Sequence, residues 1–407
     1  MRRTAVYLLL LASIPAAWAG EPLLWFCPLD FFPRPEVGYS GSPDYMRLFA
    51  ADAPWEAAAS RVKVFKIYPQ WINRATDADL ETQFASLKRR GIALALEYGA
   101  LTASDQCGRG VEGFGGNTLL AAARRIQRLG GELRYVAMDE PIFFSTLYGG
   151  ANACKWTLEQ MAANAAVNLK SLLAEFPEVK IGDIEPLPVD DTSREWLRQY
   201  SKGIEAFEAA LGFPLAFFHA DILWSNDTWP ARLAMMRDAA GDRGIPFGVI
   251  YNGNASDRSD AAWIAAAESH MAGYELELGT PDHIIFQSWH ANPRKLLPEV
   301  DADSFTSLIN RYFRTRTALT LESNGGSLSE AGGAPLAGAR VGITATPIDG
   351  AGLDSDYVLD GTVPEGVKQV VLGARVNLEC GCAAPSEFAL KSLRVELPGT
   401  ETDFQGY

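Results

Sequence analysis

The feature that most constrains the fold is a regular alternation of short apolar runs with amphipathic segments. Eight strand-like runs occupy residues 24–26, 62–68, 92–98, 133–138, 179–184, 215–220, 247–251 and 283–289. Apolar residues recur at helical spacing in segments 79–90, 118–129, 157–176, 193–211, 229–243, 261–278 and 304–312. Eight strand–helix units predict an α/β fold, a (β/α)8 (TIM) barrel.

An open, doubly wound sheet is the alternative reading of the same alternation. Such a sheet rarely needs eight units, and it usually carries a glycine-rich phosphate-binding turn directly after a strand. The glycines at positions 113, 115 and 116 follow no strand directly and lack that fingerprint. The barrel is therefore the prediction.

The chain changes character after Arg316. Glycine, serine and alanine are frequent in 324–338, and alternating strand patterns follow in 339–347, 363–378 and 388–397. We therefore expect four parts: a signal peptide (1–19), the barrel (20–317), a linker (318–338) and a small C-terminal all-β, sandwich-like domain (339–407).

The first 19 residues have the three parts of a secretory signal peptide: Arg2 and Arg3, an apolar core at 6–14, and a small-x-small site at 17–19. No later stretch is apolar enough to span a bilayer. We expect a secreted or periplasmic protein with no membrane association after removal of the signal. The net charge of -14 argues against a nucleic-acid partner.

Export permits disulfides, and the chain has five cysteines. Cys107 and Cys154 fall in loops after neighbouring strands, so we expect them to bridge. Cys27 lies in an apolar strand and is expected to be a buried free thiol. The cysteine and histidine spacings do not suggest zinc, and we predict no cofactor.

In a barrel of this kind the active site lies at the carboxyl ends of the strands. The fourth strand runs into Asp139-Glu140-Pro141, two carboxylates whose burial requires partners or a function. The other ends are rich in acids and aromatic residues and poor in histidine. Candidates at these ends are Asp30, Tyr68, Glu97, Asp139, Glu140, Glu185, Asp221, Tyr251, Asn252 and Trp289. Lys66 is the only strand lysine suited to Schiff-base chemistry, and Glu97 could simply pair with it.

Acids combined with aromatic platforms suit carbohydrates. With its signal peptide, eight units, acid-Glu-Pro after the fourth strand and C-terminal β-domain, the chain resembles secreted (β/α)8 glycoside hydrolases at the level of the superfamily. The resemblance covers about residues 22–317. In the large clan of retaining enzymes of this type, an Asn-Glu after the fourth strand supplies the acid/base. Glu140 matches that position, but Asp139 replaces the asparagine, and the seventh strand ends in Tyr251-Asn252 where the clan has its nucleophile.

The resemblance implies hydrolysis of O-glycosidic bonds in an oligo- or polysaccharide. We expect Glu140 to be the general acid/base and Glu185 the second carboxylate, because neighbouring strand ends place them within reach of one glycosidic bond. The remaining candidates, Asp30, Tyr68, Glu97, Asp139, Asp221, Tyr251, Asn252 and Trp289, are expected to bind substrate.

Two alternatives stay open. The Asp139-Glu140 pair also resembles N-acetylhexosaminidases, in which the substrate's acetamido group attacks; Tyr251 would then hold the amide. The missing acid after the seventh strand instead favours a non-catalytic carbohydrate-binding barrel. The sequence makes no prediction of the sugar, the linkage or the oligomeric state.

Overall fold

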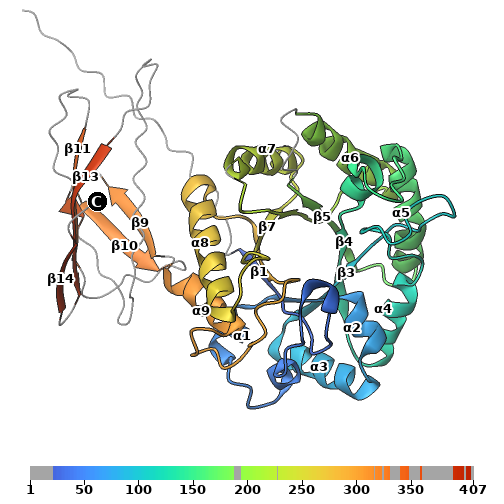
Figure 1. Ribbon diagram of the computed structural model, residues 1–407, viewed down its shortest axis with the longest axis horizontal. Coiled ribbons are helices and arrows are strands. Elements are labelled where there is room, and N and C mark those ends of the chain that lie inside the picture. Colours follow the sequence, from blue (N-terminus) through green and yellow to red (C-terminus); the bar gives the residue numbers. More distant parts are fainter. Residues whose placement is uncertain are drawn as a thin grey trace, which may run out of the picture.

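The computed structural model describes residues 22–187, 194–226 and 228–315, and beyond them only the backbone of six short strands. Eight parallel strands close into a barrel in sequence order, with β1 paired to both β2 and β8 (Figure 1). The strands are β1 (Leu23–Cys27), β2 (Val64–Ile67), β3 (Ala93–Tyr98), β4 (Leu133–Asp139), β5 (Lys180–Pro186), β6 (Phe218–Asp221), β7 (Phe247–Tyr251) and β8 (His283–Gln287). The predicted (β/α)8 barrel is confirmed.

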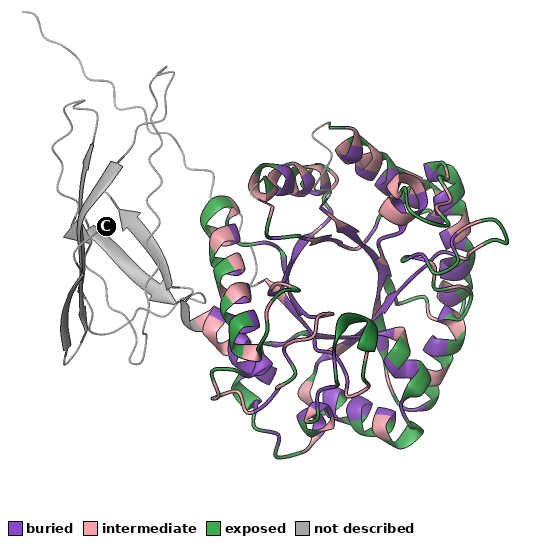
Figure 2. Cartoon of the chain, viewed as in Figure 1, coloured by how far each residue is buried: buried purple, intermediate pink, exposed green. Residues whose placement is uncertain are grey.

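Helices surround the barrel, and their outer faces are exposed while the strand ring is buried (Figure 2). They are α1 (Glu56–Arg61), α2 (Pro69–Arg74), α3 (Asp77–Arg90), α4 (Leu119–Arg128), α5 (Leu158–Leu173), α6 (Glu195–Leu211), α7 (Trp229–Gly241), α8 (Asp260–Leu278) and α9 (Phe305–Thr315). Short 3₁₀ turns, η1 (Pro35–Val37) and η2 (Tyr45–Phe49), lie in the loop after β1. A π-helical turn, η3 (Phe143–Leu147), follows β4.

Local sequence explains where the predicted helices start and stop. The Thr76 side chain accepts a hydrogen bond from the N–H of Asp79 at the start of α3, and Gly91 ends that helix with a φ of 68°. Thr157 and Gln160 form a reciprocal capping box at the start of α5. None of the helices in the described part of the chain is long and apolar enough to cross a membrane.

Two buried apolar clusters separate the inside of the barrel from its outside. The outer cluster lies between strands and helices. The inner cluster fills the barrel with Trp25, Val64, Ala95, Ala137, Ile184, Phe217, Ile250 and Ile285. Trp25 packs edge-on against both Phe217 and His219. His219 is therefore part of this interior, hydrogen-bonded to His283 at 3.0 Å, and does not lie on the rim.

Beyond α9 the described strands pair in two antiparallel groups. β9 (Thr317–Glu322) pairs with β10 (Gly325–Glu330). β11 (Arg340–Pro347) pairs with β12 (Val358–Leu359) and β13 (Phe388–Leu397), and β13 with β14 (Thr400–Phe404). The predicted signal peptide and the predicted strand at 363–378 lie outside the described residues, whereas β10 and nearly all of β9 fall in the stretch 318–338 that was expected to be a linker.

Candidate active site

The carboxyl ends of the strands form a mouth, and a polar ring there faces the barrel axis. Side chains alternate between the two faces of each strand. In β4, Ala137 belongs to the inner cluster and Met138 to the outer one, which turns Asp139 inward. The same alternation turns these side chains toward the axis: Cys27, Lys66, Tyr68, Glu97, Asp139, Asp221 and Gln287.

Lys66 and Glu97 form a buried ion pair in this ring. The Lys66 ammonium contacts the Glu97 carboxylate, and Gln287 Nε2 donates to the same carboxylate at 2.9 Å. Gln287 Nε2 also donates to the Tyr68 hydroxyl at 3.0 Å, which in turn donates to the carbonyl of Ser288 at 3.1 Å. The expected pairing of Lys66 with Glu97 is present. Lys66 is fully buried, so removal of Glu97 would leave its ammonium without a charged partner inside the barrel.

Glu140 stands where β4 turns into η3. Its φ is 51°, a left-handed conformation that costs a non-glycine residue about 1–3 kcal/mol. Strand alternation alone would turn the residue after Asp139 outward. Instead, the carboxyl group of Glu140 is hydrogen-bonded to that of Asp221 in the mouth, and the residue is only 6% exposed. Strained backbone at a buried acid is typical of functional sites.

Burial and neighbouring charges raise the pKa values of the acids around Glu140. Desolvation raises the pKa of Glu140 well above its ordinary value, and the charges of Asp221 and Asp139 add to this effect. Desolvation and then the charge of Glu97 do the same to the pKa of Asp139. Burial, followed by the charge of Glu112, raises the pKa of Asp221 to about 7. The three carboxyl groups therefore resist ionising together, and they hold protons as a coupled group.

Cys27 completes the ring beside Lys66. It is a free, buried thiol, as predicted. Burial raises its pKa to about 12, so the thiol is protonated at neutral pH. Among the described residues, no group of three or more His, Cys, Asp and Glu side chains is arranged to hold a metal ion.

Glu112, an acid that sequence reasoning missed, also reaches the mouth. It is exposed, and partial desolvation followed by the charge of Glu97 raises its pKa. The adjacent Gly113 has a φ of 82°, and a Cβ there would lie 3.0 Å from the carbonyl oxygen of Asp139. Only glycine allows the β3–α4 loop to lie this close to the end of β4. The cluster of glycines around position 113 was the available signal.

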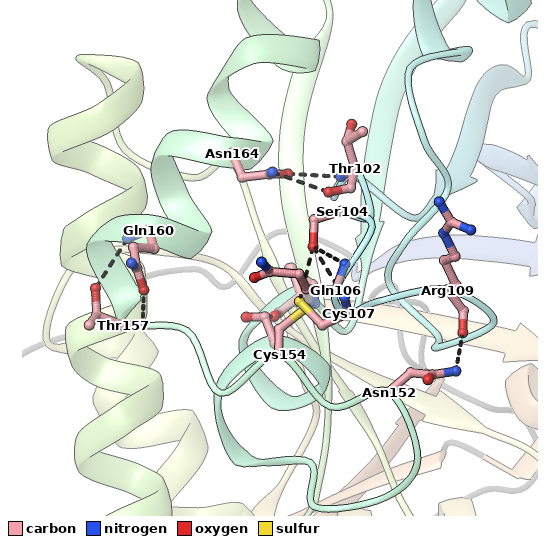
Figure 3. Close-up of a disulfide and its surroundings, with 12 residues drawn as sticks. Thr102, Ser104, Gln106, Cys107, Arg109, Asn152, Cys154, Thr157, Gln160 and Asn164 are labelled. Atoms are coloured by element: carbon pink, nitrogen blue, oxygen red, sulfur yellow. Dashed lines mark hydrogen bonds between the residues drawn. A yellow bond between two sulfur atoms is a disulfide. The ribbon is translucent and has the colours of Figure 1, made fainter.

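A disulfide fixes this loop. Cys107 and Cys154 are bonded, as predicted, and join the loop after β3 to the loop after β4 (Figure 3). Asn152 Nδ2 donates to the carbonyl of Arg109 at 2.9 Å in the same place, and the N–H of Gly108 donates to the carbonyl of Asn152 at 2.8 Å. The loop after β3 carries Glu112, and the loop after β4 begins at Glu140.

Glu185, the predicted second carboxylate, does not face the mouth. Ile184 belongs to the inner cluster and Ile181 to the outer one, so Asp183 and Glu185 point out of the barrel toward the helices. Glu185 is 0% exposed, and its carboxylate accepts the N–H groups of Ile142 at 2.6 Å and Phe143 at 2.9 Å. This corrects the prediction, because the carboxylate is fully engaged outside the site.

Tyr251 and Asn252 are also placed differently from the prediction. Tyr251 is 0% exposed and packs in the outer cluster, with its ring 6.0 Å from that of Tyr274. It therefore does not reach a ligand in the mouth. Asn252 is buried, and its Oδ1 accepts a hydrogen bond from Trp224 Nε1 at 2.8 Å. This hydrogen bond secures the β6–α7 loop, to which Trp224 belongs.

Asp30 and Trp289 complete the predicted set. The Asp30 carboxylate is buried, accepting the N–H of Phe32 at 2.7 Å and pairing with Arg34 at 3.2 Å, so it organises the loop after β1. Trp289 is half-buried and packs against the inner cluster, which leaves part of its ring at the mouth. Of the predicted residues, the structure therefore brings Tyr68, Glu97, Asp139, Glu140, Asp221 and Trp289 to the mouth.

No protein-family model matches the chain, and no curated protein is significantly similar to it. Solved structures that resemble it include fungal β-1,4-galactanases, at 14% identity over 70% of this chain and 99% of the other, with a TM-score of 0.45. They include the GH53 catalytic domain from Ignisphaera aggregans, at 12% identity over 67% and 86%, with a TM-score of 0.43. They also include the carboxyl transferase domain of Rhizobium etli pyruvate carboxylase, at 11% identity over 66% of this chain, with a TM-score of 0.42.

At 11–14% identity these likenesses identify no family for this chain. The chain spans 40% of the length of the pyruvate carboxylase chain that it matches. These likenesses concern the fold, and enzymes of several reaction classes share it.

Proposed function

We propose that this protein is a glycoside hydrolase in which Glu140 is the general acid. The observation that carries the proposal is the contact between the carboxyl groups of Glu140 and Asp221 at the barrel mouth. Glycoside hydrolysis requires a protonated carboxyl group beside an ionised one. Burial and the charge of Asp221 favour the protonated form of Glu140. Glu140 would then protonate the oxygen of the leaving sugar.

The second carboxylate comes from the inward ring, since Glu185 is engaged elsewhere. Asp139 is the candidate that this arrangement favours, because it faces the barrel axis directly beside Glu140. Asp221 touches Glu140 directly, whereas a nucleophile and its acid stand about 5 Å apart. In this proposal Asp221 tunes the proton on Glu140, and Asp139 acts on the sugar.

The other residues of the mouth suit a carbohydrate. The exposed part of the Trp289 ring can stack on the apolar face of a sugar. Glu97, Tyr68 and Glu112 offer oxygens to sugar hydroxyls. An oligo- or polysaccharide is the proposed substrate.

A substrate-assisted reaction is a second candidate, favoured by Asp139 lying directly beside Glu140. In that reaction Asp139 would orient a 2-acetamido group. Tyr251, which was expected to hold the amide, points out of the barrel and is buried, so it cannot play this part. This makes direct attack by a carboxylate the better supported mechanism.

Turnover tests the proposal. The protein is assayed on a panel of chromogenic glycosides and polysaccharides, and Glu140→Gln should lower kcat by about 10²–10⁴-fold with the fold unchanged by circular dichroism. Azide should rescue Asp139→Ala and yield a glycosyl azide if Asp139 is the nucleophile. In a substrate-assisted reaction, only 2-acetamido sugars are cleaved and azide gives no such product. Full activity of Glu140→Gln would refute both mechanisms. The better supported function would then be carbohydrate binding without catalysis by these residues.

We also propose that the protein is exported and that the segment after the barrel forms a separate β-domain. The disulfide between Cys107 and Cys154 supports an oxidising compartment. The antiparallel pairing of β11, β13 and β14 supports an all-β domain. This domain would pack on the barrel or bind carbohydrate.

A further inference from the structure

The helical segment after β4 begins in an unusual way. Glu140 precedes Pro141, the first residue of the segment, and so occupies the position at which a side chain normally caps the free N–H groups of the first turn. With its φ of 51°, Glu140 directs its carboxyl group to Asp221 in the mouth instead. The N–H groups of Ile142 and Phe143 need another acceptor, because Ile142 is buried and Phe143 is half-buried.

The neighbouring strand β5 provides that acceptor. The Glu185 carboxylate accepts both N–H groups, at 2.6 Å from Ile142 and 2.9 Å from Phe143. The preceding residue, Ile184, accepts the N–H of Glu140 through its carbonyl at 3.0 Å. Two consecutive residues of β5 therefore hold the chain on both sides of Glu140.

We propose that Glu185 is a positioning residue, which keeps Glu140 in its left-handed conformation by capping the helix start that Glu140 would otherwise cap. The inference rests on the proposed function, in which Glu140 is the general acid. Without Glu185, the two N–H groups lose their acceptor. Glu140 then relaxes toward an ordinary conformation, caps the segment with its own carboxylate and leaves Asp221.

The chain offers a matched control. Glu299 accepts the N–H groups of Ala57 at 3.1 Å and Ala58 at 2.7 Å at the start of α1, so it makes the same kind of cap with the same side chain. Glu299 is not part of the polar ring. Its replacement removes a helix cap without affecting the surroundings of Glu140.

The experiment compares Glu185→Ala, Glu185→Gln and Glu299→Ala in the full-length protein. Glu185→Ala should lower kcat by about 100-fold with KM within about 2-fold, the scale of a displaced catalytic group. It should also shift the alkaline limb of the pH profile to lower pH, because Glu140 moves away from the charge of Asp221 that raises its pKa. Glu185→Gln keeps one amide oxygen as acceptor and should recover part of kcat. Glu299→Ala should lower Tm and leave kcat and the pH profile unchanged.

A folded Glu185→Ala or Glu185→Gln with wild-type kcat and pH profile would overturn the inference, as would an equal loss of kcat in Glu299→Ala. The carboxyl ¹³C titration of Glu140 separates this result from failure of the proposed function. The wild-type protein should show the coupled titration of Glu140 with Asp221. Glu185→Ala should lose that coupling, and Glu185→Gln should weaken it. If the coupling persists, Glu185 does not position Glu140; if it is lost while Glu140→Gln remains active, only the proposed reaction fails.

Discussion

Asp221 and Glu140 together determine how the proposed activity depends on pH. The general acid must be protonated, so activity falls as the pH rises through its pKa. The charge of Asp221 raises the pKa of Glu140. Asp221→Asn removes that charge, so the alkaline limb of the kcat/KM profile should begin at lower pH. A profile with an unchanged alkaline limb would show that the two groups do not share a proton during catalysis.

Asp183 is a buried acid without an evident function. It is 0% exposed, and neither carboxyl oxygen has a well-formed hydrogen bond among the described residues, although the N–H of Ile184 lies nearby. Desolvation and then the charge of Glu185 raise its pKa well above the ordinary value. The folded state thus retains a proton that the unfolded chain releases above about pH 4, and stability falls as the pH rises from there.

Asp183→Asn should therefore stabilise the protein at neutral pH. The amide cannot ionise, so the free energy of unfolding should rise at pH 7, and this gain should disappear below about pH 4. Urea titrations of both proteins at several pH values measure this difference. A gain that is independent of pH would instead point to improved packing.

The errors of sequence reasoning at this scale have a common physical origin. A parallel strand that is covered by helices is apolar on both faces, so its sequence does not reveal which residues point inward. Glu185 and Tyr251 were placed on the rim for this reason, although both point out of the barrel. Asp139 and Asp221 were placed on the rim by the same reasoning. Each is the last residue of its strand and does point into the barrel.

At the scale of elements, the disulfide between the loops after β3 and β4 should matter for stability and for the mouth. It joins residues 47 apart in sequence. Closing a loop of that length contributes about 4 kcal/mol in the chain-entropy description. In the double variant Cys107→Ser/Cys154→Ser, the free energy of unfolding should fall by up to this amount, as measured by chemical denaturation.

The same variant should raise KM more than it lowers kcat. Glu112 belongs to the released loop, whereas Glu140 and Asp221 are held by the barrel strands. The matched comparison is Glu112→Gln, which removes the acid and keeps the disulfide. If the double variant lowers kcat alone, the loop supports the chemistry and not the substrate.

The positions of the major elements could be predicted from the sequence, because their signals are local. Strand runs and helical stripes matched the observed β1–β8 and α3–α9 closely. The short helices α1 and α2 were missed, since a helix of 6 residues has no periodic stripe. The path of the loop that carries Glu112 depends on Gly113 and on a disulfide, both contacts between distant segments.

At the scale of the whole molecule, the barrel contains everything that the proposed reaction uses. The inner cluster closes the barrel below the mouth. The acids come from strands β3, β4 and β6 or from the loops after β3 and β4, and Trp289 comes from the loop after β8. The barrel closes on itself through the pairing of β1 with β8, so its sheet has no edge for later strands to complete. The segment after α9 is therefore expected to be an accessory part of the protein.

A protein that ends near Thr317 should retain its chemistry. Its kcat per folded molecule should equal that of the full-length chain within about 2-fold, because every carboxyl group of the mouth remains. Its stability can fall if the C-terminal strands cover apolar surface of the barrel, so the folded fraction must be measured first, by near-ultraviolet circular dichroism. KM on a polysaccharide, compared with KM on a short glycoside, then shows whether the removed segment binds carbohydrate. Loss of turnover on the short glycoside in a well-folded truncated protein would mean that the C-terminal segment contributes to the site itself.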